Sequence, residues 1–195
     1  MDKNKVVSKV LKIFYPYGYV DSVFTIDYEK LYNLGYRGLI FDIDNTLVHH
    51  GKDSTPQVDD LFRYIQGMGF KTLLLSNNSE ERILRFMENI DSLYISIADK
   101  PNPAGYYKAV EMLDMKKEEV IVIGDQIFTD ILGANRSGLD SILVKFIRGE
   151  GETNFGKRRA VENFILKFYS KNKSRQKKLG DIRKREDEKQ NVKKR

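Results

Sequence analysis

The chain has 195 residues, of which 41% are hydrophobic and 32% are charged, so it is long enough for one domain with a full core and a short extension. It contains no cysteine, which excludes a disulfide framework, a thiolate nucleophile and cysteine-ligated metal sites. We find no apolar run of about 18 residues and no signal-peptide pattern, and therefore expect a cytoplasmic protein.

Charge is concentrated at the C-terminal end. The formal net charge is +6, but residues 171–195 hold 12 basic and 4 acidic residues, which leaves residues 1–170 at −2. This tail has no hydrophobic period and 16 of its 25 residues are charged, so we expect it to be disordered or a fraying helix. It is either a solvated extension, or a contact to anionic lipid or nucleic acid, of which nucleic acid is not favoured.

The N-terminal residues 3–14 predict a short amphipathic helix. Its apolar residues face one side, while Lys5, Lys9 and Lys12 face the other. Such a helix either packs on the domain or lies on an anionic membrane surface. A short strand or extended arm is expected at 23–26, and a brief helix from Tyr28 to Leu34.

The segment 38–47, GLIFDIDNTL, predicts a buried strand that opens onto a site. An apolar run leads to Asp42, and Asp44 and Thr46 follow at every second position, so in an extended backbone all three begin on one side. Two close carboxylates repel each other and need a cation, a shared proton or separate environments. A magnesium site beside a substrate phosphate would supply the cation.

Strands and helices alternate along the rest of the chain. We expect further strands at 71–75, 93–97, 119–123 and 141–144, and helices that begin at Pro56, at Asn78 or Ser79, at Pro103 and near Thr129. A last helix is expected over about 158–169. This order is typical of an α/β, Rossmann-like parallel sheet with helices on both faces.

Four of the expected strands end in polar groups: Asp42 with Asp44, Ser76 with Asn77, Lys100, and Asp125. In parallel sheets the ligand lies outside the carboxyl ends of the strands. Three carboxylates can hold a hard cation, and a lysine with a hydroxyl and an amide can hold phosphate oxygens.

These residues closely resemble the haloacid dehalogenase (HAD) superfamily of aspartate-nucleophile phosphatases. Four motifs stand in family order: DIDNT at 42–46, SNN at 76–78, KP at 100–101 and GDQIFTD at 124–130. The flanking segments VFTID and KPNPAGYYKA resemble the YqeG group of subfamily IIIA, to which mitochondrial phosphatidylglycerophosphate phosphatases are similar. The superfamily resemblance covers roughly residues 36–147.

The resemblance implies catalytic and metal-binding roles. Asp42 would attack phosphorus and form an aspartyl-phosphate, and Asp44 would protonate the leaving alkoxide and later take a proton from water. Mg²⁺ would be held by the carboxylates of Asp42 and Asp125 and by the backbone carbonyl of Asp44. This implies a phosphatase and not a dehalogenase, which does not need the second aspartate.

The remaining site residues have implied roles and simpler alternatives. Ser76, Asn77 and Lys100 would bind the phosphoryl group, Thr46 would set the turn around Asp44, and Asp130 would support the metal shell or Lys100. The alternatives are a helix cap at Ser76 or Asn77, a surface lysine and an exposed Asp130. His49 and His50 are expected in a solvated loop, because the motifs supply an acid/base without them.

The spacing of the motifs bears on the substrate. Asp44 and Ser76 are 32 residues apart and Asn77 and Lys100 are 23 apart, which leaves no room for a large cap domain. An open site favours a bulky substrate, such as a lipid headgroup at a bilayer or a macromolecule.

We therefore expect an N-terminal helix and arm (1–35), a HAD-like phosphatase domain (36–170) and a basic tail (171–195). The expected activity is Mg²⁺-dependent hydrolysis of phosphatidylglycerophosphate or a similar lipid phosphate, with the enzyme cytoplasmic and peripheral on the inner face of the membrane. The alternatives are a phosphatase of a soluble nucleotide or sugar phosphate and, less favoured, an RNA-binding protein with a HAD scaffold.

Overall fold

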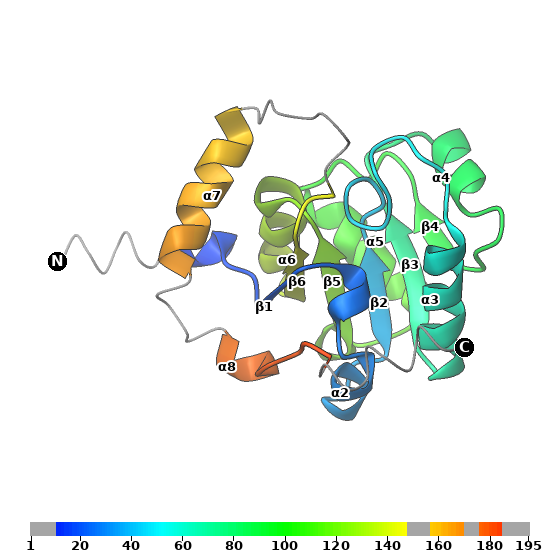
Figure 1. Cartoon of the computed structure of the whole chain (residues 1–195), viewed down its shortest axis with the longest axis horizontal. Helices are drawn as coiled ribbons and strands as arrows, with labels where there is room; N and C mark the ends of the chain where they lie inside the picture. The colour runs from blue at the N-terminus through cyan, green and yellow to red at the C-terminus, as the bar shows by residue number, and fades with distance from the viewer. Residues whose placement is uncertain (1–10, 148–156, 170–175, 185–195) are drawn as a thin grey trace, which may run out of the picture.

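The computed structural model describes residues 11–147, 157–169 and 176–184. Within them a six-stranded sheet has the order β1-β6-β5-β2-β3-β4, and every neighbouring pair is parallel. The strands are β1 (Gly18–Val20), β2 (Gly38–Phe41), β3 (Lys71–Leu75), β4 (Leu93–Ile95), β5 (Val120–Gly124) and β6 (Asp140–Val144). The predicted α/β parallel fold is confirmed (Figure 1).

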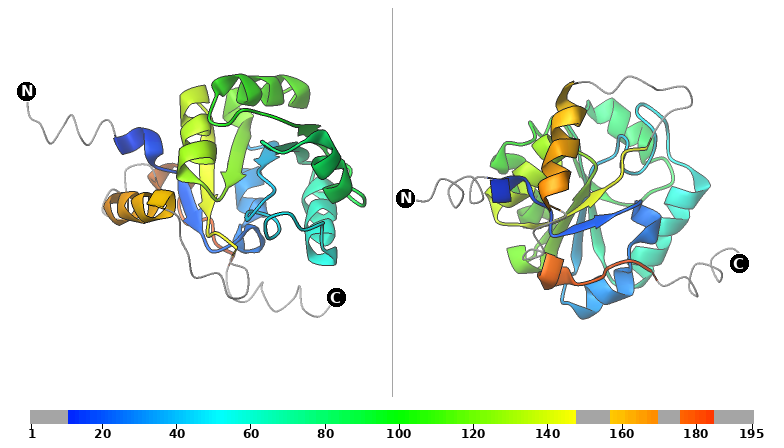
Figure 2. Two further views of the ribbon diagram at one scale, coloured as in Figure 1. Left: turned by 90° about the horizontal axis from the view of Figure 1, so that it is seen from above. Right: turned by 60° about the vertical axis from the view of Figure 1, so that its left-hand side comes forward.

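Helices cover both faces of the sheet (Figure 2). One face packs against α2 (Tyr28–Asn33), α3 (Pro56–Gly67) and α4 (Glu80–Phe86), and the other against α5 (Pro103–Leu113) and α6 (Leu132–Ser137). The connecting 3₁₀ turns are η1 (Lys12–Phe14), η2 (Val23–Thr25) and η3 (Lys117–Glu119), and a short π-helix, η4 (Ile127–Ile131), precedes α6. The central strands are buried on both faces, as expected for a parallel sheet.

The helix starts follow local capping chemistry. Thr55 accepts a hydrogen bond from the Val58 N–H, with Pro56 in the first turn, and Ser79 does the same for Arg82. Between β3 and β4 the chain holds only α4, so in the described residues this interval contains no cap domain.

The N-terminal region differs from the prediction. Residues 23–25 form η2 and not a strand, because Thr25 and Ser22 exchange side-chain and backbone hydrogen bonds that close a tight turn. An unpredicted strand, β1, pairs with β6 instead. Residues 15–34 contribute to the same cores as the rest of the domain, while the predicted helix at 3–14 lies mostly outside the described residues.

Residues 176–184 of the C-terminal segment fold onto the domain, whereas the tail was predicted to be disordered or a fraying helix. This segment forms α8 (Gln176–Leu179) and an antiparallel bridge between Ile26 and Arg183, and it buries Leu179 and Ile182 in the main core. Before it, α7 (Lys157–Tyr169) packs beside the β1 edge of the sheet (Figure 1). None of the helices in these described ranges is both long and apolar enough to cross a bilayer.

Candidate active site

The candidate site lies at the carboxyl ends of the central strands. Asp42 directly follows β2, Ser76 follows β3 and Asp125 follows β5. Because β2 pairs with β3 on one side and with β5 on the other, the order in which the strands are added to the sheet reverses at this point, where doubly wound sheets bind their ligands. One oxygen from each of Asp42, Asp125 and Asp130 lies within 4.8 Å of the others.

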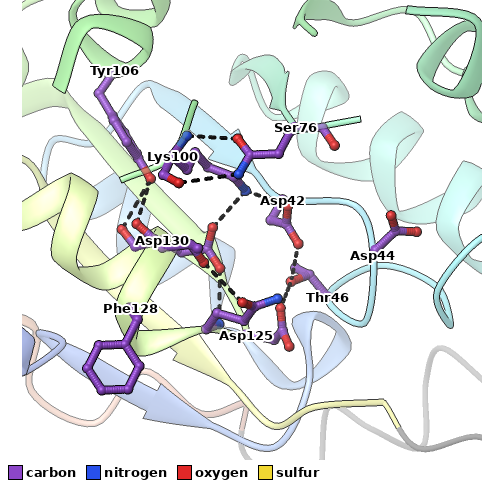
Figure 3. Close-up of polar contacts among 12 residues, drawn as sticks. Asp42, Asp44, Thr46, Ser76, Lys100, Tyr106, Asp125, Phe128 and Asp130 are labelled. Atoms are coloured by element: carbon purple, nitrogen blue, oxygen red, sulfur yellow. Dashed lines mark hydrogen bonds and ion pairs between the residues drawn. The ribbon is translucent and has the colours of Figure 1, made fainter. Parts of the chain in front are cut away.

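Lys100 joins two of these carboxylates. Its Nζ donates to Asp42 Oδ1 at 2.5 Å and to Asp130 Oδ1 at 2.7 Å, and all three side chains are buried (Figure 3). Burial alone would lower the pKa of Lys100, but the charges of Asp130 and Asp42 raise it above its usual value. Lys100 is therefore a buried cation and not the surface lysine of the alternative reading.

Burial raises the pKa of Asp42, and the nearby Lys100 opposes that effect while Asp130 adds to it. The cluster brings together three carboxylates, those of Asp42, Asp125 and Asp130, and Lys100 pairs with two of them, Asp42 and Asp130. A divalent cation bound by carboxylate oxygens would balance this excess negative charge.

Asn77 positions Lys100. The Lys100 N–H donates to Asn77 Oδ1 at 2.7 Å, and the Asn77 amide donates to the Lys100 carbonyl at 3.3 Å. The structure thus shows Asn77 fixing the backbone of Lys100, while its predicted phosphate contact stays a prediction. The buried Ser76 hydroxyl accepts a hydrogen bond from the Asn78 N–H, as in a cap, and stands at the carboxyl end of β3.

Thr46 lies between two carboxylates. Its Oγ1 is 3.2 Å from Asp42 Oδ2 and 3.3 Å from Asp125 Oδ1, so its one proton can serve either carboxylate. We expected Thr46 to set the turn around Asp44, and the structure adds this link between Asp42 and Asp125.

Asp130 fits closely under the end of β5. Its Oδ2 accepts the Gln126 N–H at 3.0 Å, and its Oδ1 accepts a hydrogen bond from Lys100 Nζ, while its predicted supporting role in the site stays a prediction. A Cβ on Gly124 would lie 2.4 Å from Asp130 Cγ, so only glycine allows this approach. The exposed-acid alternative for Asp130 is wrong, since the residue is buried.

The Asp44 side chain points away from the cluster (Figure 3). Its carboxylate accepts hydrogen bonds from Arg82 Nη2 at 3.1 Å, from the Gly51 N–H at 2.9 Å and from Asn78 Nδ2 at 2.5 Å. Burial would raise the pKa of Asp44, but the Gly51 and Asn78 hydrogen bonds and the Arg82 charge lower it below its usual value. In this conformation the carboxylate of Asp44 is fixed by three hydrogen bonds.

The two histidines differ from each other. His50 is exposed, as expected for a loop, and its Nδ1 lies 3.4 Å from Asp44 Oδ2. His49 is only partly exposed. The structure therefore links one histidine to the predicted acid/base residue.

Four further hydrogen bonds were missed by sequence reasoning. Arg82 and Asn78 hold Asp44, and their only signal was their place at the start of a helix that follows a polar strand end. The buried Tyr106 hydroxyl donates to the Thr129 carbonyl and packs on Gly133, which ties α5 to η4. Glu162 of α7 accepts the Ile127 N–H at 2.9 Å, a contact across 35 residues that no local pattern indicates.

The donor set fits a hard divalent cation. The Asp42 and Asp125 carboxylates face one another across Thr46, while Asp130 is already occupied by Lys100 and the Gln126 N–H. Oxygen donors of this kind suit Mg²⁺. The structure groups Asp130 and not the Asp44 carboxylate with the other two, and the predicted Asp44 ligand is its backbone carbonyl, which stays a prediction.

Comparison with known proteins agrees with this architecture. Residues 53–138 match the model of the haloacid dehalogenase-like hydrolase family. The chain is 40% identical over 134 residues to "Probable phosphatase YqeG" of Bacillus subtilis, which covers 68% of this chain and 78% of that protein.

Two shorter matches have different names. The chain is 32% identical over 100 residues to a glyceraldehyde 3-phosphate phosphatase of Methanopyrus kandleri, covering 46% of this chain and 42% of that protein. It is 31% identical over 114 residues to the pyrophosphatase PpaX of Halalkalibacterium halodurans, covering 52% of this chain and 53% of that protein. The predicted superfamily is confirmed, and the chain belongs to the haloacid dehalogenase-like hydrolases.

Proposed function

We propose that this phosphatase is a magnesium-dependent enzyme that hydrolyses phosphate monoesters through a phosphorylated Asp42. The observation that carries the proposal is that Asp42, Asp125 and Lys100 are buried together at the point where the strand order reverses. A nucleophile, an anionic metal site and a fixed cation there supply what phosphoryl transfer needs, which is positioning and charge stabilisation.

The reaction takes two steps. An Asp42 oxygen attacks phosphorus, the bond from phosphorus to the alcohol oxygen breaks, and the leaving alkoxide takes a proton from Asp44. Water then attacks phosphorus and gives a proton to Asp44, and the bond from phosphorus to Asp42 breaks, releasing phosphate. Lys100 offsets negative charge beside Asp42 in both steps. Mg²⁺, held by Asp42, Asp125 and the Asp44 carbonyl, would neutralise charge on the phosphoryl oxygens.

This mechanism requires Asp44 to turn. Its carboxylate is held by Arg82 and Asn78 and points away from Asp42. A carboxylate with a lowered pKa is a poor proton donor, so these contacts must loosen before Asp44 protonates a leaving group. Arrival of the anionic phosphate supplies a competing partner for Arg82.

The substrate we favour is a lipid phosphate such as phosphatidylglycerophosphate, cleaved by a cytoplasmic enzyme peripheral to the membrane. A cavity of about 330 Å³ beside Asp125, lined also by Tyr19, Phe146 and Leu166, has polar and apolar walls and room for a headgroup. A soluble ester is the second candidate, because the similar proteins of M. kandleri and H. halodurans are named for glyceraldehyde 3-phosphate and pyrophosphate. An RNA-binding scaffold is disfavoured, because binding RNA does not need a buried carboxylate cluster.

A phosphate-release panel tests the proposal. Full-length protein is assayed with lipid, nucleotide and sugar phosphates, with Mg²⁺, Ca²⁺ or excess chelator. We expect release with Mg²⁺, poor support by Ca²⁺, whose looser coordination misplaces the reacting groups, and none in chelator. Asp125→Ala should abolish turnover or raise the Mg²⁺ requirement, whereas Asp114→Ala, on the turn after α5, should not. Full activity in chelator would overturn the metal assignment, and release from soluble esters alone would overturn the lipid substrate.

A further inference from the structure

Helix α7 has two unlike faces. Its inner face packs against η1, η4 and β6 through Ile165 and Tyr169. Its outer face leaves two aromatic side chains in solvent: Phe164 is 59% exposed and Phe168 is 44% exposed, and Val161 beside them is 49% exposed. The two phenylalanine rings contact each other edge to face at 4.9 Å. Large apolar side chains grouped in this way on a helix that is already packed indicate a contact surface.

The charges of α7 are sorted between the same two faces. Glu162 is the only acidic residue of the helix, and it is buried, where it accepts the N–H groups of Ile127 and Phe128. Lys167 is exposed beside the aromatic pair, and the helix begins in the sequence with Lys157, Arg158 and Arg159. With its acid turned inward, α7 offers a partner basic and aromatic groups.

We propose that the outer face of α7, formed by Val161, Phe164, Lys167 and Phe168, docks the protein on an anionic lipid bilayer. Phenylalanines on one side of a helix rich in Lys and Arg suit the boundary between headgroups and acyl chains, and the basic residues are attracted to anionic lipid. The docking does not depend on which ester is cleaved.

Charge argues for a bilayer and against a second copy of the chain. A twofold dimer through this face would bring Lys167 of both copies into one interface, and like charges disfavour that contact. An anionic surface instead complements the charge.

Helix α7 lies between this surface and the candidate site. Glu162, Asn163 and Leu166 of the helix line the cavity that also contains Asp125, and the first turn of α7 lies toward the carboxyl ends of the strands (Figure 1). Glu162 and Leu166 are on the other side of the helix from Phe164. The docked bilayer would therefore lie across α7 from the cavity, and the docking does not rest on the proposed function.

Vesicle sedimentation tests the docking. Full-length protein is mixed with phosphatidylcholine vesicles that either contain or lack phosphatidylglycerol. We expect binding only to the anionic vesicles, and weaker binding as salt rises. The double variant Phe164→Gln/Phe168→Gln should bind about tenfold more weakly or worse, since it removes two apolar side chains from the bilayer boundary.

A matched control uses two exposed apolar residues elsewhere. Leu34 and Leu84 are 45% and 50% exposed, at the end of α2 and in α4, and Leu34→Gln/Leu84→Gln should bind vesicles like the wild type. Phosphate release from a soluble ester, measured on both variants, reports the enzyme separately from the docking. The proposal is overturned if the wild type stays in the supernatant at low salt or if the phenylalanine variant binds normally. It is also overturned if the wild type is a dimer that this variant makes monomeric.

Discussion

The two ends of the parallel sheet are built from different chemistry. At the carboxyl ends, Asp42, Lys100, Asp125 and Asp130 are buried together in a network of charges. At the amino ends, Leu179 and Ile182 of the C-terminal segment cover the start of β1. A Cβ on Gly18 there would lie 2.6 Å from Ile182 Cδ1, so the packing is close enough to require glycine.

This difference separates function from stability. Removing charges from water is costly, and a cluster with more carboxylates than cations is kept only where its charge is used. At the amino ends, Tyr36 and Lys178 both donate to the buried carboxylate of Asp140, which therefore has a donor on each side. We therefore expect changes at the carboxyl ends to remove activity, and changes at the amino ends to lower stability without changing the activity of each folded molecule.

The largest effect is expected from Asp42→Asn. The variant keeps the shape of the side chain but lacks the attacking charge, so phosphate release should fall by several orders of magnitude. Because burial already raises the pKa of Asp42, the fold does not depend on its charge, and the thermal unfolding midpoint should change little. Asp60→Asn, at an exposed acid of α3, is the control and should alter neither quantity. Turnover near the wild-type level in Asp42→Asn would refute the mechanism.

Lys100→Met tests whether the charged cluster at the carboxyl ends of the strands also contributes to the stability of the fold. Removing the shared cation leaves Asp42 and Asp130 facing each other, which should lower the free energy of unfolding by about 3–5 kcal/mol. Adding Asp130→Asn to this variant should restore part of the loss, because one of the unpaired charges is gone. Urea unfolding of the two variants measures both effects, and equal stability of Lys100→Met and the wild type would contradict the charge balance proposed here.

Ile182→Ala tests the amino end. The residue is 3% exposed and packs on β1, so its truncation should cost about 2–3 kcal/mol, at the low end for core isoleucines because the segment lies at one end of the sheet. Activity per folded molecule should stay at the wild-type level, since the contact lies far from Asp42. Leu84→Ala, at an exposed position of α4, should stay within about 0.5 kcal/mol. If Ile182→Ala lost activity without losing stability, the assignment of activity to the carboxyl ends and of stability to the amino ends would be contradicted.

Arg82→Gln should have the smallest effect, and one that depends on pH. Arg82 donates to Asp44 and to the Lys52 carbonyl, so its loss should cost about 1 kcal/mol at pH 7 in chelator. Since the pKa of Asp44 is lowered in the folded protein, this stabilisation is present above the unfolded pKa of about 4 and is lost as the pH falls through the folded value. The difference between wild type and variant should therefore become smaller in acid, where only the contact with the Lys52 carbonyl remains. A difference that stays constant with pH would mean that the charge of Asp44 does not contribute to it.

The local sequence pattern was enough to predict most strands and helices and the location of the candidate site. Periodicity and capping residues predicted β2, β3, β5, α3 and α5 almost at their observed bounds, because buried parallel strands and amphipathic helices are encoded by neighbouring residues. Since strand ends meet at one edge of a parallel sheet, the polar residues at those ends already placed Asp42, Ser76, Lys100 and Asp125 together.

Tertiary contacts decided how these side chains are used. Asp44 begins beside Asp42 in the sequence, yet Arg82 and Asn78 turn it away, and Asn77 holds the Lys100 backbone. Such partners lie 20 to 40 residues apart in the chain, where no periodicity relates them. The same holds for Leu179 and Ile182, two apolar residues within a highly charged stretch. Only the glycine at the start of β1 makes room for them, and that complementarity exists once the chain has folded.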